Sequence, residues 1–173
     1  MSTRRSVVLA IVLALLAAYF ALFEGFSGPR AARDAALDEK LFDCADGAPQ
    51  RITVATARGS LSARRNGEHW ETTVGGLAPA AFEALAESLC RLPVIDRIAG
   101  ATRLEEYGLA PAAGEIHVVA GSQERRLLIG MPTPASNLMY AKFADRDEVL
   151  KIGVELASNV ERVARFAPTG NGA

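Results

Sequence analysis

An uncharged stretch near the amino terminus constrains this chain more than any other feature. It begins at Ser6, ends at Phe23 and contains no Asp, Glu, Lys, Arg or His. As a helix it would span roughly 27 Å at about 1.5 Å per residue, close to the hydrocarbon thickness of a bilayer. Its apolar side chains occupy every side rather than one stripe. We therefore expect residues 6–23 to cross the lipid bilayer as one transmembrane signal-anchor helix.

The residues that flank this stretch indicate its orientation. Arg4 and Arg5 lie in a tail of residues 1–5, whereas Glu24 follows the stretch directly. Positive charge favours the cytoplasmic side, so we expect a single-pass protein of the bacterial inner (cytoplasmic) membrane whose domain faces the periplasm. A cleaved secretory signal is the alternative, but this apolar run is longer than the usual signal and no clear small-residue cleavage site follows it.

The remainder of the chain has the size of one domain. Of 19 Lys and Arg side chains, Arg4 and Arg5 precede the stretch, which leaves 17 basic against 20 acidic side chains after it. This balance offers no bulk attraction for nucleic acid, which we exclude as a partner. We expect a stalk at 24–40, an extracytoplasmic domain at 41–166 and a disordered tail at 167–173.

Alternating apolar and polar residues predict a three-stranded meander at the start of the domain. The segments are 51–57, 61–65 and 70–74, and each is typical of a half-buried strand. Asn66-Gly67 joins the last two and is the dipeptide most typical of a two-residue type I′ hairpin turn.

Helical periodicity follows in two places, with a second group of strands between them. After Pro79 an apolar stripe falls on one side of a helix that Pro93 stops, and a second stripe lies within 154–166. The stripes are Phe82, Leu85, Ala86 and Leu89, and Leu156, Val160 and Val163. A brief helix is expected to end at Gly108. Four further strands are expected at 115–120, 124–130, 138–143 and 148–152. Their short connections favour antiparallel neighbours, so the predicted class is α+β, with antiparallel β-meanders and two or three short helices.

This order of elements, read with several short motifs, resembles a known family. The motifs are Leu41-Phe42-Asp43, Trp70, Tyr107-Gly108-Leu109-x-Pro111, Leu127-Leu128-Ile129-Gly130, Tyr140 and Val149-Leu150. Their order and spacing resemble the family known as domain of unknown function 4340 over most of residues 41–152. Many members have an N-terminal anchor and some are encoded beside ABC transporters of the gliding-motility type. The resemblance therefore implies an extracytoplasmic auxiliary subunit, and it implies no catalytic residues.

The two cysteines, Cys44 and Cys90, are far apart and form no C-x-x-C motif. This spacing excludes a zinc knuckle or a thioredoxin-like motif. In a periplasmic domain a disulfide between them is one interpretation, and two separately buried thiols are the other.

No motif in the chain predicts catalysis or a cofactor site. His69 and His117 are the two histidines, no serine lies in a G-x-S-x-G motif, and no nucleotide-binding glycine motif occurs. We expect both histidines to be ordinary half-exposed imidazoles, with no catalytic, cofactor-binding or metal-binding residue and no enzymatic activity. In the adjacent basic pairs Arg64-Arg65 and Arg125-Arg126, the two members of each pair must point to opposite faces of a strand. We interpret them as providing solubility and edge protection, with contact to a partner or a lipid headgroup as the alternative.

Four side chains are candidates for an interface or a pocket: Trp70, Tyr107, Met131 and Tyr140. For Trp70 we favour packing between the meander and the first helix, with an interface as the alternative. The function we expect is that of a non-enzymatic, membrane-anchored auxiliary or scaffold subunit, bound to other membrane or envelope proteins in a multi-protein assembly. The resemblance suggests an ABC-type transport or gliding-motility-like system. The alternative is an extracytoplasmic ligand-binding or sensing module with its pocket near Tyr107, Met131 and Tyr140.

Overall fold

One antiparallel sheet forms the framework of the described part of the chain. A computed structural model describes residues 13, 39–45, 47–74, 76–134 and 137–168. Within them, eight strands form a sheet in the order β3-β2-β1-β5-β6-β7-β8-β4. Their bounds are β1 Arg51–Thr56, β2 Gly59–Asn66, β3 His69–Thr72, β4 Asp96–Ile98, β5 Gly114–Ala120, β6 Gln123–Pro132, β7 Leu138–Phe143 and β8 Val149–Gly153. Every neighbouring pair is antiparallel, as the short connections predict.

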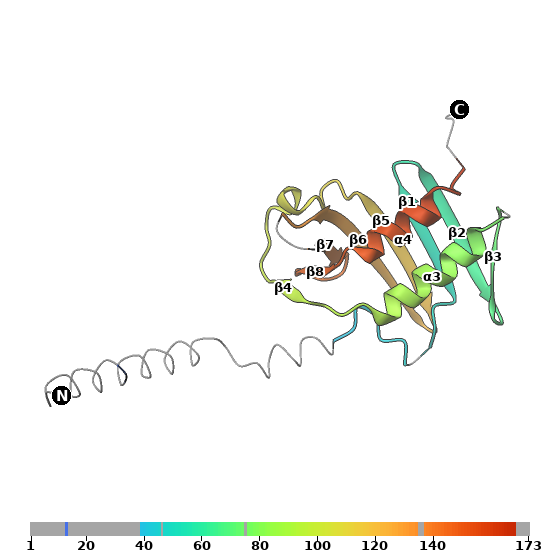
Figure 1. The fold of residues 1–173 in the computed structure, drawn as a ribbon, viewed down its shortest axis with the longest axis horizontal. Helices are drawn as coiled ribbons and strands as arrows, with labels where there is room; N and C mark the ends of the chain where they lie inside the picture. The colour runs from blue at the N-terminus through green and yellow to red at the C-terminus, as the bar shows by residue number, and fades with distance from the viewer. Residues whose placement is uncertain (1–12, 14–38, 46, 75, 135–136, 169–173) are drawn as a thin grey trace, which may run out of the picture. The chain divides into compact units, whose positions relative to one another are not determined.

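Two α-helices lie across one face of this sheet (Figure 1), and they pack against each other. They are α3, Ala78–Arg91, and α4, Glu155–Ala164. The predicted stripes are confirmed, because the structure buries Phe82, Leu85, Ala86, Leu89, Leu156, Val160 and Val163. The predicted brief helix is a 3-10 turn, η1, Leu104–Tyr107, and it ends at Gly108 with φ of +65°. The α+β class is therefore confirmed for the described residues.

The core lies between the helices and the face of the sheet that they cover. Strand residues alternate in burial: Ile52 and Val54 of β1 are 0% and 1% exposed, whereas Thr53 between them is half-buried on the other face. On that other face the hydroxyl oxygens of Thr53 and Ser62 lie 3.0 Å apart. The period of two thus separates an apolar face from a polar one.

One strand pairing completes the prediction and one turn differs from it. The sequence leaves open how the two groups of strands meet, and in the structure β1 pairs with β5 and places Ile52 opposite Val118. The hairpin between β2 and β3 forms, but Asn66 pairs with His69, which leaves Gly67 and Glu68 as the two-residue loop. Gly67 has φ of +61° and no described non-glycine residue has positive φ. The glycine therefore occupies the first central position, as in a type II′ turn, and the predicted I′ geometry is wrong.

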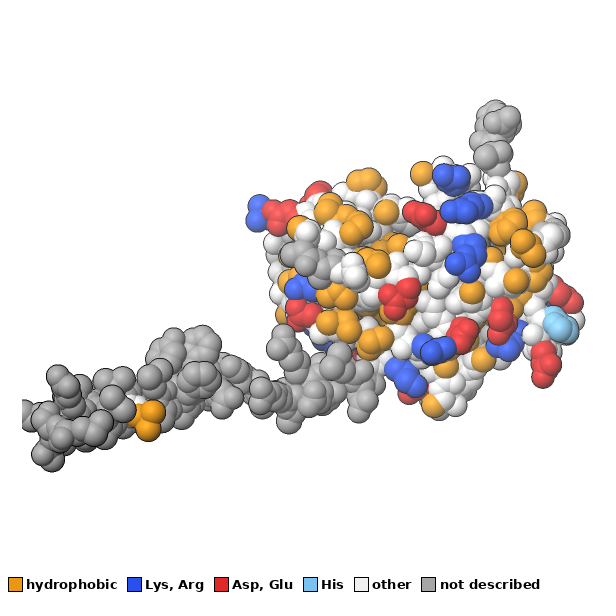
Figure 2. Space-filling view, viewed as in Figure 1, with side chains coloured by type: hydrophobic (Ala, Val, Ile, Leu, Met, Phe, Trp, Pro, Cys, Tyr) orange, Lys and Arg blue, Asp and Glu red, His pale blue; other side chains and the backbone are white. Residues whose placement is uncertain are grey.

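The chain divides into two units, Met1–Ala36 and Leu37–Ala173. The second unit starts before the predicted boundary at 41, since Val94 N donates to Glu39 O at 2.8 Å. At its other end Ala167, predicted to begin a disordered tail, packs against the core. The face of this unit in Figure 2 carries interspersed acidic and basic side chains.

The predicted anchor at 6–23 falls outside the described residues, except for Leu13. Among the residues that the structure describes, no helix has both the length and the apolar character needed to cross a membrane.

Candidate functional site

Trp70 is a packing residue of the core. Its side chain is 4% exposed, and its ring stacks on that of Phe82 of α3 with centroids 6.0 Å apart. The guanidinium of Arg65, which belongs to β2, lies 6.0 Å from the centroid of the Trp70 indole. This is the position between meander and helix that the sequence analysis favours.

Tyr107, Met131 and Tyr140 are brought together by the fold. The rings of Tyr107 and Tyr140 meet edge to face with centroids 5.0 Å apart. A Cβ added to Gly108 would lie 2.9 Å from Met131 N, so the chain around η1 packs closely on β6. Met131 itself is 42% exposed. The three cavities described below are lined by other residues, and a pocket at this cluster stays a prediction.

The strap, residues 39–45, is fastened to the domain. Leu41 N donates to Leu92 O at 2.7 Å, just beyond the end of α3. A disulfide joins Cys44 to Cys90 of α3, with Cα atoms 5.6 Å apart, which is within the range that a disulfide requires. The structure therefore contains the first of the two arrangements that the sequence leaves open.

A cavity of about 710 Å³ opens beside the strap. Its wall combines the strap with the turn between β5 and β6 and with residues of β6 and β7. Val118 and Arg125 face each other across β5 and β6 on the helix-covered face of the sheet. The charged side chains of the lining are Lys40, Arg97, Arg125, Arg146, Glu39 and Asp43. Two smaller cavities, of about 400 and 430 Å³, adjoin α3 and α4.

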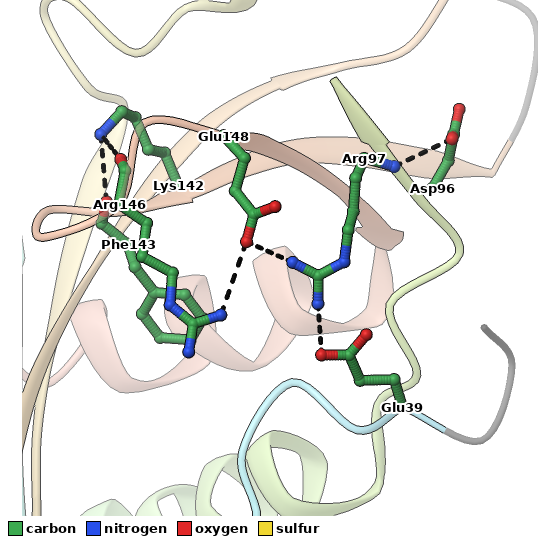
Figure 3. A network of polar contacts seen from close by, with 7 residues as sticks. All are labelled: Glu39, Asp96, Arg97, Lys142, Phe143, Arg146 and Glu148. Carbon is green, nitrogen blue, oxygen red and sulfur yellow. Dashed lines mark hydrogen bonds and ion pairs between the residues drawn. The ribbon is translucent and has the colours of Figure 1, made fainter. Parts of the chain in front are cut away.

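Arg97 is the centre of a polar network at the edge of this cavity (Figure 3). Its guanidinium binds the carboxylates of Glu148 and Glu39, which come from β7–β8 and from the strap. Burial disfavours the charge of Arg97, but the hydrogen bonds to Glu148 and Glu39 outweigh this effect and raise its pKa. The hydrogen bond from Arg97 lowers the pKa of Glu148, against the opposing effect of burial. Both groups are therefore held in their charged forms.

A second part of the network surrounds the ring of Phe143. The guanidinium carbons of Arg125 and Arg146 lie 5.7 and 5.3 Å from its centroid. Arg146 Nη1 is 3.5 Å from Glu148 Oε1. Lys142, only 9% exposed, donates from Nζ to Phe143 O at 3.1 Å and to Arg146 O, and so fastens the turn that carries Arg146. The arrangement presents half-buried cationic donors beside an aromatic ring, which suits recognition of an anion.

This basic cluster was missed by the sequence analysis. The pair Arg125-Arg126 was noted, but β6 lies between β5 and β7, so protection of a sheet edge is the wrong explanation. Its two members do face opposite sides: Arg125 lines the cavity, and Arg126 Nε lies 3.5 Å from Glu115 Oε1 on the other face. The alternation of side chains along a strand predicts that Arg125 and Arg126 lie on different faces. No motif in the sequence predicts that Arg97 and Arg146 join Arg125 at the cavity.

The histidines lie away from this cavity. His69 is exposed, and His117 is half-exposed with Nε2 2.8 Å from Glu124 Oε1. The hydrogen bonds of the described residues do not join either imidazole to a serine or a cysteine. The expected half-exposed environment is found for His117, whereas His69 is more exposed than expected.

Comparison with known proteins adds no relative: no family model, no curated protein and no solved structure matches the chain. The resemblance to domain of unknown function 4340 therefore stays a prediction from the sequence.

Proposed function

We propose that this chain is a non-enzymatic, membrane-anchored auxiliary or scaffold subunit of a multi-protein envelope assembly. Residues 6–23 would hold it in the bacterial inner membrane, and the domain would face the periplasm. The resemblance described above favours an ABC-type transport or gliding-motility-like system as the assembly.

The observation that carries this proposal is the way the strap is fastened. The segment that continues the chain from the proposed anchor is bonded into the domain through Leu41 N, through the Arg97–Glu39 ion pair and through the disulfide of Cys44. Fastening the strap to α3 and β4 makes the first described segment after the proposed anchor part of the folded unit, which supports the interpretation that the domain begins directly after a short connection to the anchor.

The disulfide supports the proposed compartment. Disulfides persist in the bacterial periplasm and are rare in the reducing cytosol. Cys44 and Cys90 are 46 residues apart, and a crosslink over a loop of that size contributes up to about 4 kcal/mol in the chain-entropy model. Oxidation would therefore stabilise the domain in the place where we propose that it works.

Membrane topology is the first test. A reporter enzyme that is active only in the periplasm, fused after Ala173, should be active in cells that produce the full chain. A cytoplasmic reporter at the same position should be inactive. If the cytoplasmic reporter alone is active, both the location and the role are wrong.

Crosslinking in living cells is the second test. A photoreactive amino acid is placed, one site at a time, at exposed positions in separate parts of the domain: Glu68, Ser122, Asp147 and Glu161. We expect discrete adducts with membrane proteins from a subset of these positions. In the matched control residues 1–23 are replaced by a cleavable secretory signal, which releases the domain and should abolish the adducts. A chain that forms no adduct at any position while its anchor is intact would contradict the scaffold role.

The cavity gives the alternative, a ligand-binding or sensing module, a concrete location. Its volume of about 710 Å³ lies within the range of about 300–1,000 Å³ that is typical of small-molecule sites. The site would lie beside the strap rather than at Tyr107, Met131 and Tyr140.

A further inference from the structure

The positive charges of the strap-side cavity are unequally matched by carboxylates. Arg97 binds two of them, Glu39 and Glu148. Arg125, by contrast, forms no ion pair among the described residues, and its Nη2 has only a marginal contact with Gln123 Oε1 at 3.5 Å.

Arg146 is also incompletely paired. Glu148 is the one carboxylate that it approaches within the described chain, at 3.5 Å, and the same oxygen atom already accepts from Arg97. Of the acidic residues in the lining, Glu39 is engaged with Arg97, and Asp43 Oδ1 accepts from Ala45 N at 3.0 Å. Two guanidinium groups therefore retain donors for a further acceptor.

These two groups also share an aromatic neighbour. Both lie over the ring of Phe143, which is 3% exposed and fixed in the core against Phe42, with ring centroids 5.4 Å apart. Like charges that approach the same ring repel each other, and an anion that contacts both removes this repulsion. The Lys142 ammonium binds Phe143 O and Arg146 O, so the backbone turn from which the Arg146 side chain extends is held in place before a ligand binds.

The rim of the cavity adds further hydrogen-bond donors. Ser122 in the β5–β6 turn offers a hydroxyl, Gln123 an amide and Lys40 an ammonium group, and all three line the cavity. The volume exceeds what a single phosphate ion fills, which leaves room for an organic portion of the ligand.

We infer that this cavity binds an organic anion through a phosphate or carboxylate group, to which both Arg125 and Arg146 donate hydrogen bonds. The planar donor array of arginine matches the oxygen geometry of both groups. The ligand is either a free small molecule or the headgroup of an anionic lipid, which share this chemistry. The inference concerns the cavity alone and does not depend on the proposed assembly.

The experiment uses the full chain in micelles of an uncharged detergent. In one arm inorganic phosphate and citrate are titrated by calorimetry, with sodium chloride at equal ionic strength as reference. In the other arm short-chain phosphatidic acid is mixed into the micelles, with phosphatidylcholine as reference. Saturable binding in the first arm identifies a free anion as the source, and saturable binding in the second arm alone identifies a lipid headgroup.

The variants Arg125→Gln and Arg146→Gln should each raise the dissociation constant about tenfold, the loss of affinity expected for one charge-assisted contact. Arg126→Gln is the matched control, because it removes the same charge from the adjacent residue on the opposite face and should leave binding unchanged. Circular dichroism checks folding, and if Arg146→Gln does not fold, Arg125→Gln decides.

Three results would overturn the inference. They are an absence of saturable binding in both arms, equal binding by Arg125→Gln and the unmodified chain, and an equal loss in Arg126→Gln.

Discussion

The face of the sheet that carries the helices has two differently built regions. Under α3 the contact is apolar and closed: Phe82, Leu85 and Leu89 of α3 are all 0% exposed. Beside the strap the same face carries Arg125 next to Phe143 and opens into the cavity of about 710 Å³. One sheet thus supports a dry core at one region and a wet, charged recess at the other.

The two regions are also stabilised by different forces. Helix packing depends on burial of apolar area, which is non-directional and repeats at helical spacing. The strap region depends on a disulfide and on ion pairs between residues far apart, such as Arg97 and Glu148 at a separation of 51. The helical region is therefore expected to be robust to pH and redox change, and the strap region to be sensitive to both.

Truncation of the helical core should have the largest effect. Leu85→Ala is expected to lower the free energy of unfolding by about 2–5 kcal/mol, since it removes a fully buried side chain and leaves a cavity. Urea denaturation followed by circular dichroism measures it. The matched control is Leu77→Ala, at a residue that is 73% exposed, for which a change within about 0.5 kcal/mol is expected. Equal losses at both positions would show that this helix face is not the stabilising one.

Removal of the disulfide should come next. The double variant Cys44→Ser, Cys90→Ser is expected to lose about 2–4 kcal/mol of unfolding free energy, because the unfolded chain regains the freedom of a loop closed across 46 positions. Unfolding midpoints with and without reductant measure the loss. The unmodified chain should respond to reductant and the double variant should not. Identical midpoints for all four samples would contradict the fastening role of the strap.

A smaller, pH-dependent effect is expected at Glu148. Its pKa is lowered in the folded state, so it stabilises the fold fully above its ordinary pKa and progressively less as the pH falls below about 4.5. Glu148→Gln should cost about 1 kcal/mol at pH 7 and less than that at pH 3. Denaturant unfolding at both pH values measures the difference.

Glu105→Gln is the control for this substitution, because Glu105 is exposed and its side chain forms no ion pair within the described residues. A cost for Glu148→Gln that stays constant between pH 7 and pH 3 would assign its effect to packing instead of charge.

The smallest effect is expected at the edge of the sheet. Lys151 Nζ lies 2.7 Å from Asp96 Oδ2, and this hydrogen bond raises the pKa of Lys151. The contribution is therefore present below the ordinary pKa of a lysine and is lost as the pH rises through the higher folded value. Lys151→Met should cost about 0.5 kcal/mol at pH 7. A double-mutant cycle with Asp96→Asn measures the coupling energy of the pair, and a coupling energy of zero would show that the pair does not stabilise the fold.

The family resemblance, the anchor and the partners are predictions from the sequence. The topology and crosslinking experiments test the anchor and the partners. The fold is a different matter, since several of its elements can be compared directly. The stripe of Phe82, Leu85 and Leu89 and the class of antiparallel α+β domain followed from periodicity and short connections. The hairpin after β2 was also anticipated, with its loop one residue early, because Asn66 prefers pairing with His69 and leaves the positive φ to Gly67.

The sequence by itself determined what depends on neighbours along the chain: the helix faces, most of the strands and the uncharged stretch at 6–23. Tertiary structure alone decided the pairing of β1 with β5, the union of Cys44 with Cys90 and the meeting of Arg97 with its two carboxylates. The physical reason is that periodicity records which side of an element is buried, whereas an ion pair, a crosslink or a strand partner depends on where a distant element comes to lie. The cavity beside the strap is assembled from segments that lie far apart in the sequence.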